Sequence, residues 1–183
     1  MTAGVVLLSA VAVAIVAAIV IYNRLVGARL RVREAWSAID VQLQRRASLI
    51  PNLVESVTGY AAYERGTMER VVEARTALTS ASGPRSAAQA NAELSSALHA
   101  IFILAEAYPD LKASERFAQL QADLTDTENK IAFARNYYNG AVEAYNTTVQ
   151  SVPGVFIAAP FQFTPAEFFA ADEPSRQPVV ARP

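Results

Sequence analysis

The chain has 183 residues and a mass of 19.7 kDa, the size of one domain with an attachment. It contains no cysteine and one histidine, His99, which excludes disulfides, thiolate catalysis, cysteine zinc sites and multi-histidine metal sites. Sixteen basic and seventeen acidic residues give a net charge of −1, which argues against a dedicated nucleic-acid binder. Charged residues make up only 18% of the chain and hydrophobic residues 52%, so apolar surface is concentrated locally. Composition therefore argues against an enzyme.

The first predicted element is residues 3–22, a run of uncharged residues, AGVVLLSAVAVAIVAAIVIY. A helix of this length reaches roughly 30 Å, which matches the hydrocarbon core of a bilayer. A cleaved secretory signal is one alternative, but it needs a positive n-region and only Met1 and Thr2 precede the run. A buried core helix is the other alternative. The run has no polar stripe and is predicted to be a transmembrane helix.

Positive charges follow this run and predict its orientation. Arg24, Arg29, Arg31 and Arg33 lie on the C-terminal side, while the N-terminal side has only the α-amino group. The positive-inside rule then places the N-terminus outside and the bulk of the chain in the cytoplasm. The same arginines either contact anionic lipid or serve only as a topology signal.

After Tyr22 the apolar residues recur at helical spacing and predict a long amphipathic helix that extends towards residue 80. Pro51 would clash with the carbonyl of Ala47 and removes one donor, so a kink or a break is expected near Ile50. Ser48 alternatively caps a fresh helix. The predicted buried face includes one charged residue, Arg46, and otherwise consists of Val32, Trp36, Ile39, Leu43, Ile50, Leu53 and Val57.

Two further helices are predicted beyond a Gly-Pro loop at residues 80–86. One covers residues 87–108 and ends before Pro109. The other begins after Ser114, a capping residue, and continues to Gln150, before Pro153 and Gly154. Its predicted buried face follows a regular alternation: Phe117, Leu120, Leu124, Thr127, Ile131, Ala134, Tyr138, Ala141, Tyr145, Thr148 and Val152.

The C-terminal part begins with an apolar segment, VFIAAPFQF at residues 155–163, which we call the strap. Pro160 favours an extended conformation across a groove between helices. Thr164 to Glu167 form a capping-box pattern, which predicts a short helix to about Ala171 that presents Phe168 and Phe169. Residues 172–183 contain three prolines and are expected to form a mobile tail.

Together these elements predict an all-α fold. An N-terminal transmembrane helix (residues 1–22) is followed by an antiparallel up-and-down bundle of long helices (residues 23–152), since the connections between them are short. Residues 153–171, the strap and the short C-terminal helix, are expected to pack on this bundle, and residues 172–183 form the flexible tail.

Three stretches resemble the LemA family of bacterial membrane proteins. They are AWSAIDVQLQRRASLIPNLVESVTGYAAYE at residues 35–64, AYPDLKASERFAQLQADLTDTENKIAFARNYYNGAVEAYN at residues 107–146, and VPGVFIAAPFQF at residues 152–163. The resemblance spans nearly the entire chain. It implies a helical bundle with an anchored N-terminal helix and an extracytoplasmic N-terminus, and no enzymatic activity from which catalytic residues could be transferred. One branch of the family is linked to magnetosome membrane formation, and some relatives are encoded beside an HtpX-type membrane protease.

A polar cluster on the last long helix is the strongest candidate for a site. It resembles the TEN and RxxYN motifs of the family and consists of Asp126, Glu128, Lys130, Arg135, Asn136 and Asn139. A buried arginine needs a carboxylate or several carbonyls, so Arg46 is predicted to pair with Glu128 across the bundle. A ligand site is the alternative, with Glu55, Glu64 and Glu128 as its carboxylates.

Other signals for chemistry are weak. The Glu-x-x-His pairs of ferritin-like bundles are missing, although magnesium or calcium stays open. The segment around His99 favours a core-edge histidine over a general base. No G-x-S-x-G, Walker A or G-x-G-x-x-G motif occurs, and the spacing of the aromatic residues, including Trp36, favours bundle core over a cofactor box. We therefore expect no catalytic, cofactor-binding or metal residues.

The leading hypothesis is a single-pass scaffold of the cell membrane that organises an assembly through helix-face contacts. Its expected partners are the lipid bilayer, further copies of the chain and a membrane protein such as an HtpX-type protease, with no nucleic acid. A carboxylate-based enzyme or metal-dependent accessory protein is one competing hypothesis. A signalling adaptor that recruits a membrane protease is the other.

Overall fold

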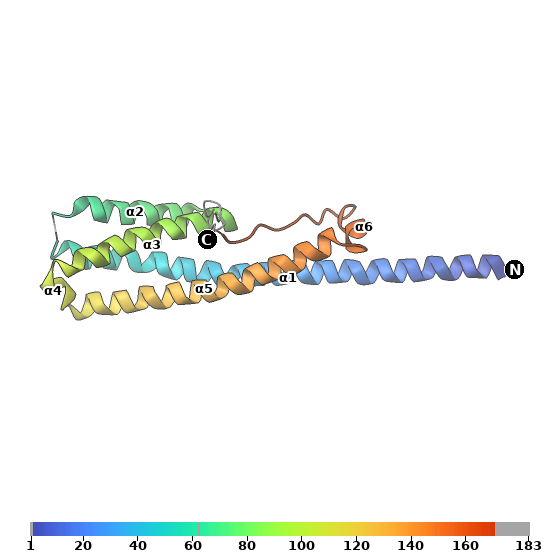
Figure 1. Cartoon of the computed structure of the whole chain (residues 1–183), viewed down its shortest axis with the longest axis horizontal. Coiled ribbons are helices and arrows are strands. Elements are labelled where there is room, and N and C mark those ends of the chain that lie inside the picture. The colour runs from blue at the N-terminus through green and yellow to red at the C-terminus, as the bar shows by residue number, and fades with distance from the viewer. Residues whose placement is uncertain (1, 62, 171–183) are drawn as a thin grey trace, which may run out of the picture. The chain divides into compact units, whose positions relative to one another are not determined.

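The computed structural model describes residues 2–61 and 63–170, which form six helices and no β-strand (Figure 1). The helices are α1 (Thr2–Thr58), α2 (Arg65–Ser80), α3 (Pro84–Glu106), α4 (Pro109–Lys112), α5 (Glu115–Gln150) and α6 (Gly154–Ala158). This confirms the all-α class and the long N-terminal apolar helix. The predicted tail, residues 172–183, lies outside the described residues.

The helices contribute to two compact units. One unit comprises residues up to Ser37 together with residues 136–167, and the other comprises residues 38–135 together with the described residues from Phe168 on. Because α1 and α5 each pass from one unit into the other, the unit boundaries differ from the helix boundaries. The domain boundaries predicted from the sequence, after residues 22, 152 and 171, stay predictions.

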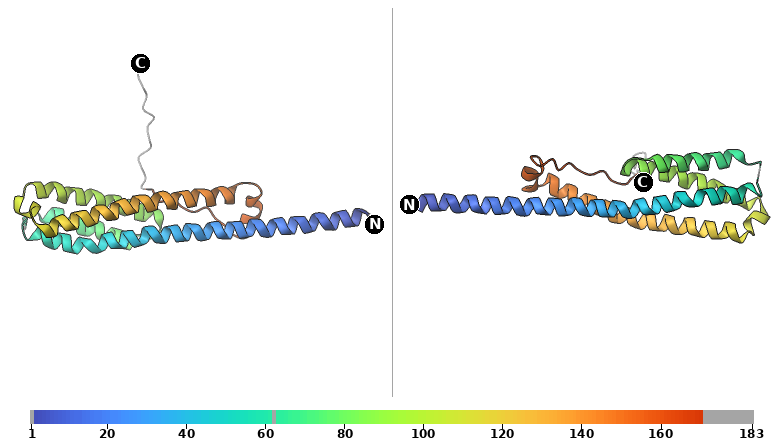
Figure 2. Two further views of the ribbon diagram at one scale, coloured as in Figure 1. Left: turned by 90° about the horizontal axis from the view of Figure 1, so that it is seen from below. Right: turned by 180° about the vertical axis from the view of Figure 1, so that it is seen from behind.

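The second unit is an antiparallel bundle. The chain reverses direction between α1 and α2, between α2 and α3, and between α3 and α5, so that neighbouring segments run in opposite directions (Figures 1 and 2). Short connections between the helices favour this up-and-down arrangement. Its buried side chains include Ile39, Leu43, Ile50, Leu53, Val71, Leu94, Leu98, Ile101, Phe117 and Leu124.

The first helix ends at Thr58, so the prediction of helix towards residue 80 is wrong. Gly59 lies at the end of α1, where the amides of Tyr60 and Ala61 both bond to the carbonyl of Val57. Glycine is a poor helix former, which favours an end at this point. The chain then turns back, and α2 buries Met68, Val71, Ala74 and Leu78 along its own face of the bundle.

Pro51 lies inside α1 without breaking it, so of the kink or break expected near Ile50 the break is wrong. The proline leaves the carbonyl of Ala47 without its usual intrahelical donor. Nε of Arg75, on α2, donates a hydrogen bond of 3.0 Å to that carbonyl instead. A buried carbonyl that finds another donor no longer opposes the helix, so α1 continues through the proline.

The predicted boundaries of the later helices are close to the observed ones. The loop before α3 contains Gly83, whose φ of 90° lies in the region that favours glycine. Pro84 then occupies the first turn of α3, where its missing N–H costs nothing. The last long helix, α5, begins one residue after Ser114 and ends at Gln150, as predicted.

After Gly154, the helical and non-helical parts of the chain are the reverse of the prediction. The strap begins as α6 and continues in turns to Gln162, and residues 163–170 are not helical. The short helix expected after Thr164 is therefore wrong. Side chains of α5 bond to the carbonyls of Thr164, Ala166 and Glu167, and a helix would need these carbonyls for its own bonds.

The N-terminal half of α1 exposes its apolar side chains. Leu8, Val13 and Val16 are 72, 70 and 60% exposed. Within the described residues, α1 is the helix long and apolar enough to cross a membrane. Such a helix is stable in lipid because all of its backbone bonds lie within the segment.

Candidate functional site

A buried arginine lies at the centre of the second unit. Arg46 is only 3% exposed, and its guanidinium pairs with Glu128 of α5, as the sequence predicted. The Nη1 atom also donates a 2.6 Å hydrogen bond to Oδ1 of Asn91 on α3. The charge of one helix is therefore held by groups from two others.

Burial lowers the pKa of Arg46, and the negative charge of Glu128 opposes this effect. A guanidinium is not deprotonated in proteins, so Arg46 stays charged in the core. Its Nε has no hydrogen-bond partner among the described residues. The ion pair with Glu128 is thus the main compensation for the lost hydration of Arg46.

A groove of about 350 Å³ opens beside this pair. Its lining includes Arg46, Ser95, His99, Phe102 and Glu128. The hydroxyl of Ser95 donates to Oε2 of Glu128 over 3.3 Å, so the carboxylate is already engaged from two sides. Sequence spacing placed no carboxylate beside His99. The structure brings Glu128 to the same groove because α3 and α5 pack together.

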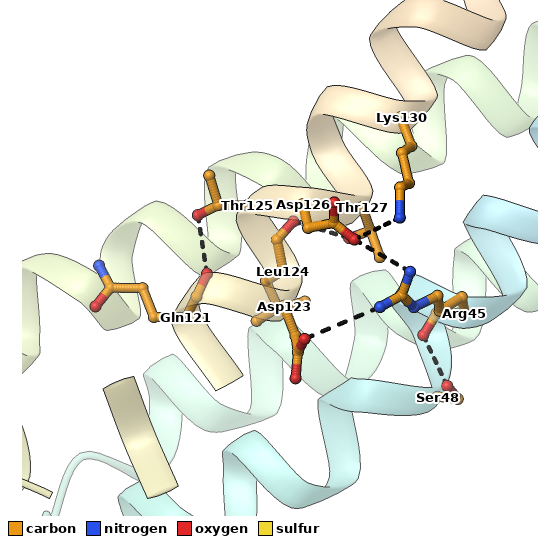
Figure 3. A network of polar contacts seen from close by, with 9 residues as sticks. All are labelled: Arg45, Ser48, Gln121, Asp123, Leu124, Thr125, Asp126, Thr127 and Lys130. Carbon is orange, nitrogen blue, oxygen red and sulfur yellow. Dashed lines mark hydrogen bonds and ion pairs between the residues drawn. The ribbon is translucent and has the colours of Figure 1, made fainter. Parts of the chain in front are cut away.

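A separate, more exposed network of charges joins Arg45 of α1 to Asp123, Asp126 and Lys130 of α5 (Figure 3). Nη1 of Arg45 lies 3.1 Å from Oδ2 of Asp126, Nη2 lies 3.9 Å from Oδ1 of Asp123, and Nζ of Lys130 lies 2.8 Å from the same oxygen of Asp126. The hydrogen bond from Lys130, together with the charge of Arg45, lowers the pKa of the Asp126 carboxyl. Solvent and salt screen such contacts, so they add little to stability.

The candidate carboxylates do not share a site. Oε2 of Glu55 pairs with Arg116 over 2.6 Å, and Oε1 of Glu64 accepts a 3.5 Å bond from the hydroxyl of Tyr108. Glu128 pairs with Arg46. No group of three or more acidic or histidine side chains arranged for a metal occurs among the described residues.

The remaining residues of the polar cluster lie further along α5. Arg135 and Asn136 are exposed, and Asn139 is half-buried. Arg135 belongs to the second unit and the two asparagines to the first. The cluster is therefore divided between the two units, and its members at Asp126 and Glu128 have different neighbours.

Side chains of α5 also hold the segment after the strap in the first unit. Asn146 donates from Nδ2 to the carbonyl of Ala166 over 2.9 Å and accepts from the amide of the same residue over 2.7 Å. The hydroxyls of Tyr145 and Tyr138 donate to the carbonyls of Thr164 and Glu167 over 3.0 and 2.8 Å. Residues 164–167 therefore run back along α5 of their own chain.

Replacing Asn146 by alanine should release this segment. The variant loses two hydrogen bonds, each of which contributes about 1 kcal/mol. Phe163 is buried, so chymotrypsin cuts after it only when the segment opens, and cleavage should be about five- to thirty-fold faster. Asn136→Ala, an exposed position on the same helix, is the control and should leave the rate unchanged. Equal rates in both variants would contradict the assigned role of Asn146.

The stability of the chain should fall at high pH because of Tyr138. Burial, aided by the charge of Glu167, raises the pKa of Tyr138 from 10.0 to about 12. Between these values the phenol is protonated in the folded chain and ionised in the unfolded one. The unfolded state then binds fewer protons, so stability decreases as the pH rises through this window, by up to about 2 kcal/mol. Unfolding should be measured at both ends of the window beside Tyr138→Phe, in which this share of the decrease should disappear.

The sequence of the chain is similar to known proteins of one family. A model of the LemA family matches residues 35–181. The chain is 23% identical over 155 residues to Protein LemA of Metamycoplasma hominis, covering 84% of this chain and 71% of that protein. It is also 23% identical over 170 residues to magnetosome protein MamQ 2 of Paramagnetospirillum magneticum and to magnetosome protein MamQ of Magnetospirillum gryphiswaldense, covering 79% of this chain and 62% of each relative. The chain thus spans less than two thirds of the length of these two magnetosome proteins.

Proposed function

The chain belongs to the LemA family, and from this premise we propose that it is a single-pass membrane protein whose helical body acts as a scaffold. One observation carries the proposal. Most side chains of the uncharged run are exposed from Gly4 on, and the run continues, within one helix, into the residues that build both units. A helix that exposes this much apolar surface requires a covering, and a bilayer of matching thickness supplies one.

The proposed orientation places the N-terminus outside the cell and the helical body in the cytoplasm. Arg24, Arg29, Arg31 and Arg33 support it, because positive residues near the end of a span favour the cytoplasmic side. Trypsin added outside intact cells should leave the body of the chain uncut. Digestion of the body by external trypsin would contradict this orientation and support the opposite one.

The membrane anchor is tested by charge. Val11→Arg combined with Ile15→Arg places two guanidiniums near the middle of the run, each of which costs about 2.5–3.5 kcal/mol in a bilayer. We expect the variant to leave the membrane fraction during an alkaline wash that retains the native chain. The control, Val41→Arg with Val72→Arg, changes two exposed apolar residues of the helical body and should stay bound. Retention of both variants would contradict the anchor.

The scaffold is proposed to bind further copies of the chain or a membrane protein such as an HtpX-type protease. Exposed apolar side chains on the helical body support this, and Phe133 on α5 is 78% exposed. A photo-crosslinking residue at position 133 should trap one discrete product in native membranes. The same residue at Gln121, an exposed polar position on α5, should trap little. Monomeric chain from both positions would contradict the scaffold.

A further inference from the structure

We propose that the strap, residues 155–163, is a second membrane-contacting element that inserts into the leaflet beside the C-terminal end of the apolar helix. The inference rests on the proposed anchoring of residues 3–22. It adds a lipid contact from a part of the chain more than a hundred residues away from the anchor in sequence.

The strap lies directly against the apolar helix within the first unit. Ile157 and Phe161 line a groove of about 370 Å³ together with Ile15, Ile19 and Tyr22 of α1. The rings of Phe161 and Tyr22 meet edge to face, with their centroids 5.0 Å apart. The depth of these α1 residues in a bilayer therefore sets the depth of the strap.

Ile15 and Ile19 lie inside the apolar run. They precede Tyr22 by seven and three residues, which places them roughly 5–10 Å inward from the end of the run at 1.5 Å per residue. Segments that lie in the membrane interface are buried to a similar depth of roughly 5–10 Å. If α1 crosses a bilayer, the strap is in the interface rather than in bulk water.

The composition of the strap suits this location. Phe156 is 70% exposed and Phe161 57% exposed, although both are large and apolar. Residues 144–166 contain no Asp, Glu, Lys or Arg, so no charge opposes insertion of the strap. Lipid acyl chains would cover the aromatic side chains that the protein leaves exposed.

Backbone amides of the strap also form hydrogen bonds within the chain, as a medium with little water requires. The amides of Val155, Phe156, Ala159, Gln162 and Phe163 all bond to carbonyls between Ser151 and Ala159. Unsatisfied amides are costly in lipid, and these local bonds remove that cost.

The charges next to the strap distinguish a leaflet from a second copy of the chain as the covering. Arg29 lies 5.9 Å from the ring centroid of Phe163, and Arg29 and Arg33 line an adjacent groove with Phe161. Moving away from the apolar run, the surface changes from apolar to aromatic to cationic. Acyl chains, interface and anionic head groups follow the same order.

Site-directed spin labelling of the full chain tests the inference, and the native sequence has no cysteine that would interfere. Single cysteines replace Phe156, Leu8 in the apolar run and Gln121, an exposed polar residue of the helical body. The labelled chains are placed in vesicles of phosphatidylcholine and phosphatidylglycerol. Collision rates are measured with oxygen, which concentrates in lipid, and with a nickel complex, which stays in water.

We expect the oxygen-to-nickel ratio at position 156 to approach that at position 8 and to be several times that at position 121. A water-like ratio at 156 beside a lipid-like ratio at 8 would overturn the inference and leave the anchor standing. Water-like ratios at both positions would overturn the anchor and the inference together.

Two further outcomes are distinguished by the same samples. Shielding of position 156 from both reagents, with dipolar broadening, would mean that a second copy covers the strap, and would overturn the inference. If Phe156→Cys loses helical circular dichroism, Val155→Cys, which is less exposed at 36%, takes its place with the same expected ratios.

Discussion

Replacing Glu128 by alanine is expected to lower the free energy of unfolding of the full chain by about 3 kcal/mol, because it leaves the guanidinium of Arg46 buried without a carboxylate. Breaking a fully buried pair costs about 3–5 kcal/mol, and the lower end applies here because 45% of the Glu128 side chain reaches solvent. Denaturation of the chain in detergent, followed by circular dichroism, measures the change.

Two control variants isolate this cause. Glu55→Gln breaks the pair with Arg116. The side chains of Glu55 and Arg116 are 68 and 57% exposed, so the free energy of unfolding should fall by at most about 1 kcal/mol. Arg46→Met removes the buried charge itself and should stay within about 1 kcal/mol of the native chain, since apolar replacements of buried ions are often neutral. An unchanged stability of Glu128→Ala would contradict the structural role of the pair.

A further variant, Glu128→Gln, decides between the scaffold and the carboxylate-based alternative. A structural Glu128 predicts that loss of stability accompanies any loss of function. An active site at the groove beside His99 would instead lose function in Glu128→Gln while the free energy of unfolding stays the same. The Glu128 carboxylate is already bound by Arg46 and Ser95, which favours the structural role.

Replacing Gly154 by alanine is expected to destabilise the chain by about 3 kcal/mol. Gly154 is buried at the start of α6, and a Cβ atom there would collide with the backbone carbonyl of Thr148. A backbone atom cannot move aside as the end of a flexible side chain can, so the strap must shift away from α5. Thermal unfolding in detergent and chymotrypsin cleavage after Phe163 should both report the change.

Gly140 offers a matched control for this substitution. It lies inside α5, and a Cβ atom there would meet nothing within 4 Å. Alanine is a better helix former than glycine, so Gly140→Ala should stabilise the chain by about 0.5–1 kcal/mol. Opposite signs for the two variants would identify the contact with Thr148 as the cause. Equal effects would contradict it.

Helical spacing predicted most of the buried face of α5. The prediction fails beyond Tyr138, and the cause is geometric. The predicted residues from Phe117 to Tyr138 are all buried. After Tyr138, however, Val142 and Val149 are buried, whereas Ala141 and Thr148 are only half-buried and Val152 is 74% exposed. A straight helix drifts by about 20° per heptad from a repeat of 3.5 residues. Over four heptads this drift moves the buried face by almost one residue.

The pairing of Arg46 with Glu128 was predictable because a charged residue in an apolar seam requires a carboxylate. The proximity of His99 to Glu128 was not, since it depends on how α3 and α5 are rotated against each other. The role of Arg75 at the carbonyl of Ala47 was equally hidden. It exists because the chain reverses after Thr58 and brings α2 back along α1.

By itself the sequence determined the all-α class of the chain, its uncharged N-terminal run and the need for a partner to Arg46. Each of these depends on residue types and spacing within one segment, where hydrophobic periodicity and desolvation act locally. Only the tertiary structure decided where α1 ends, that residues 164–167 are not helical and which apolar residues of the strap stay exposed. These features depend on competition between distant groups, as when Asn146 and the tyrosines of α5 bond to backbone carbonyls that a local helix would have used.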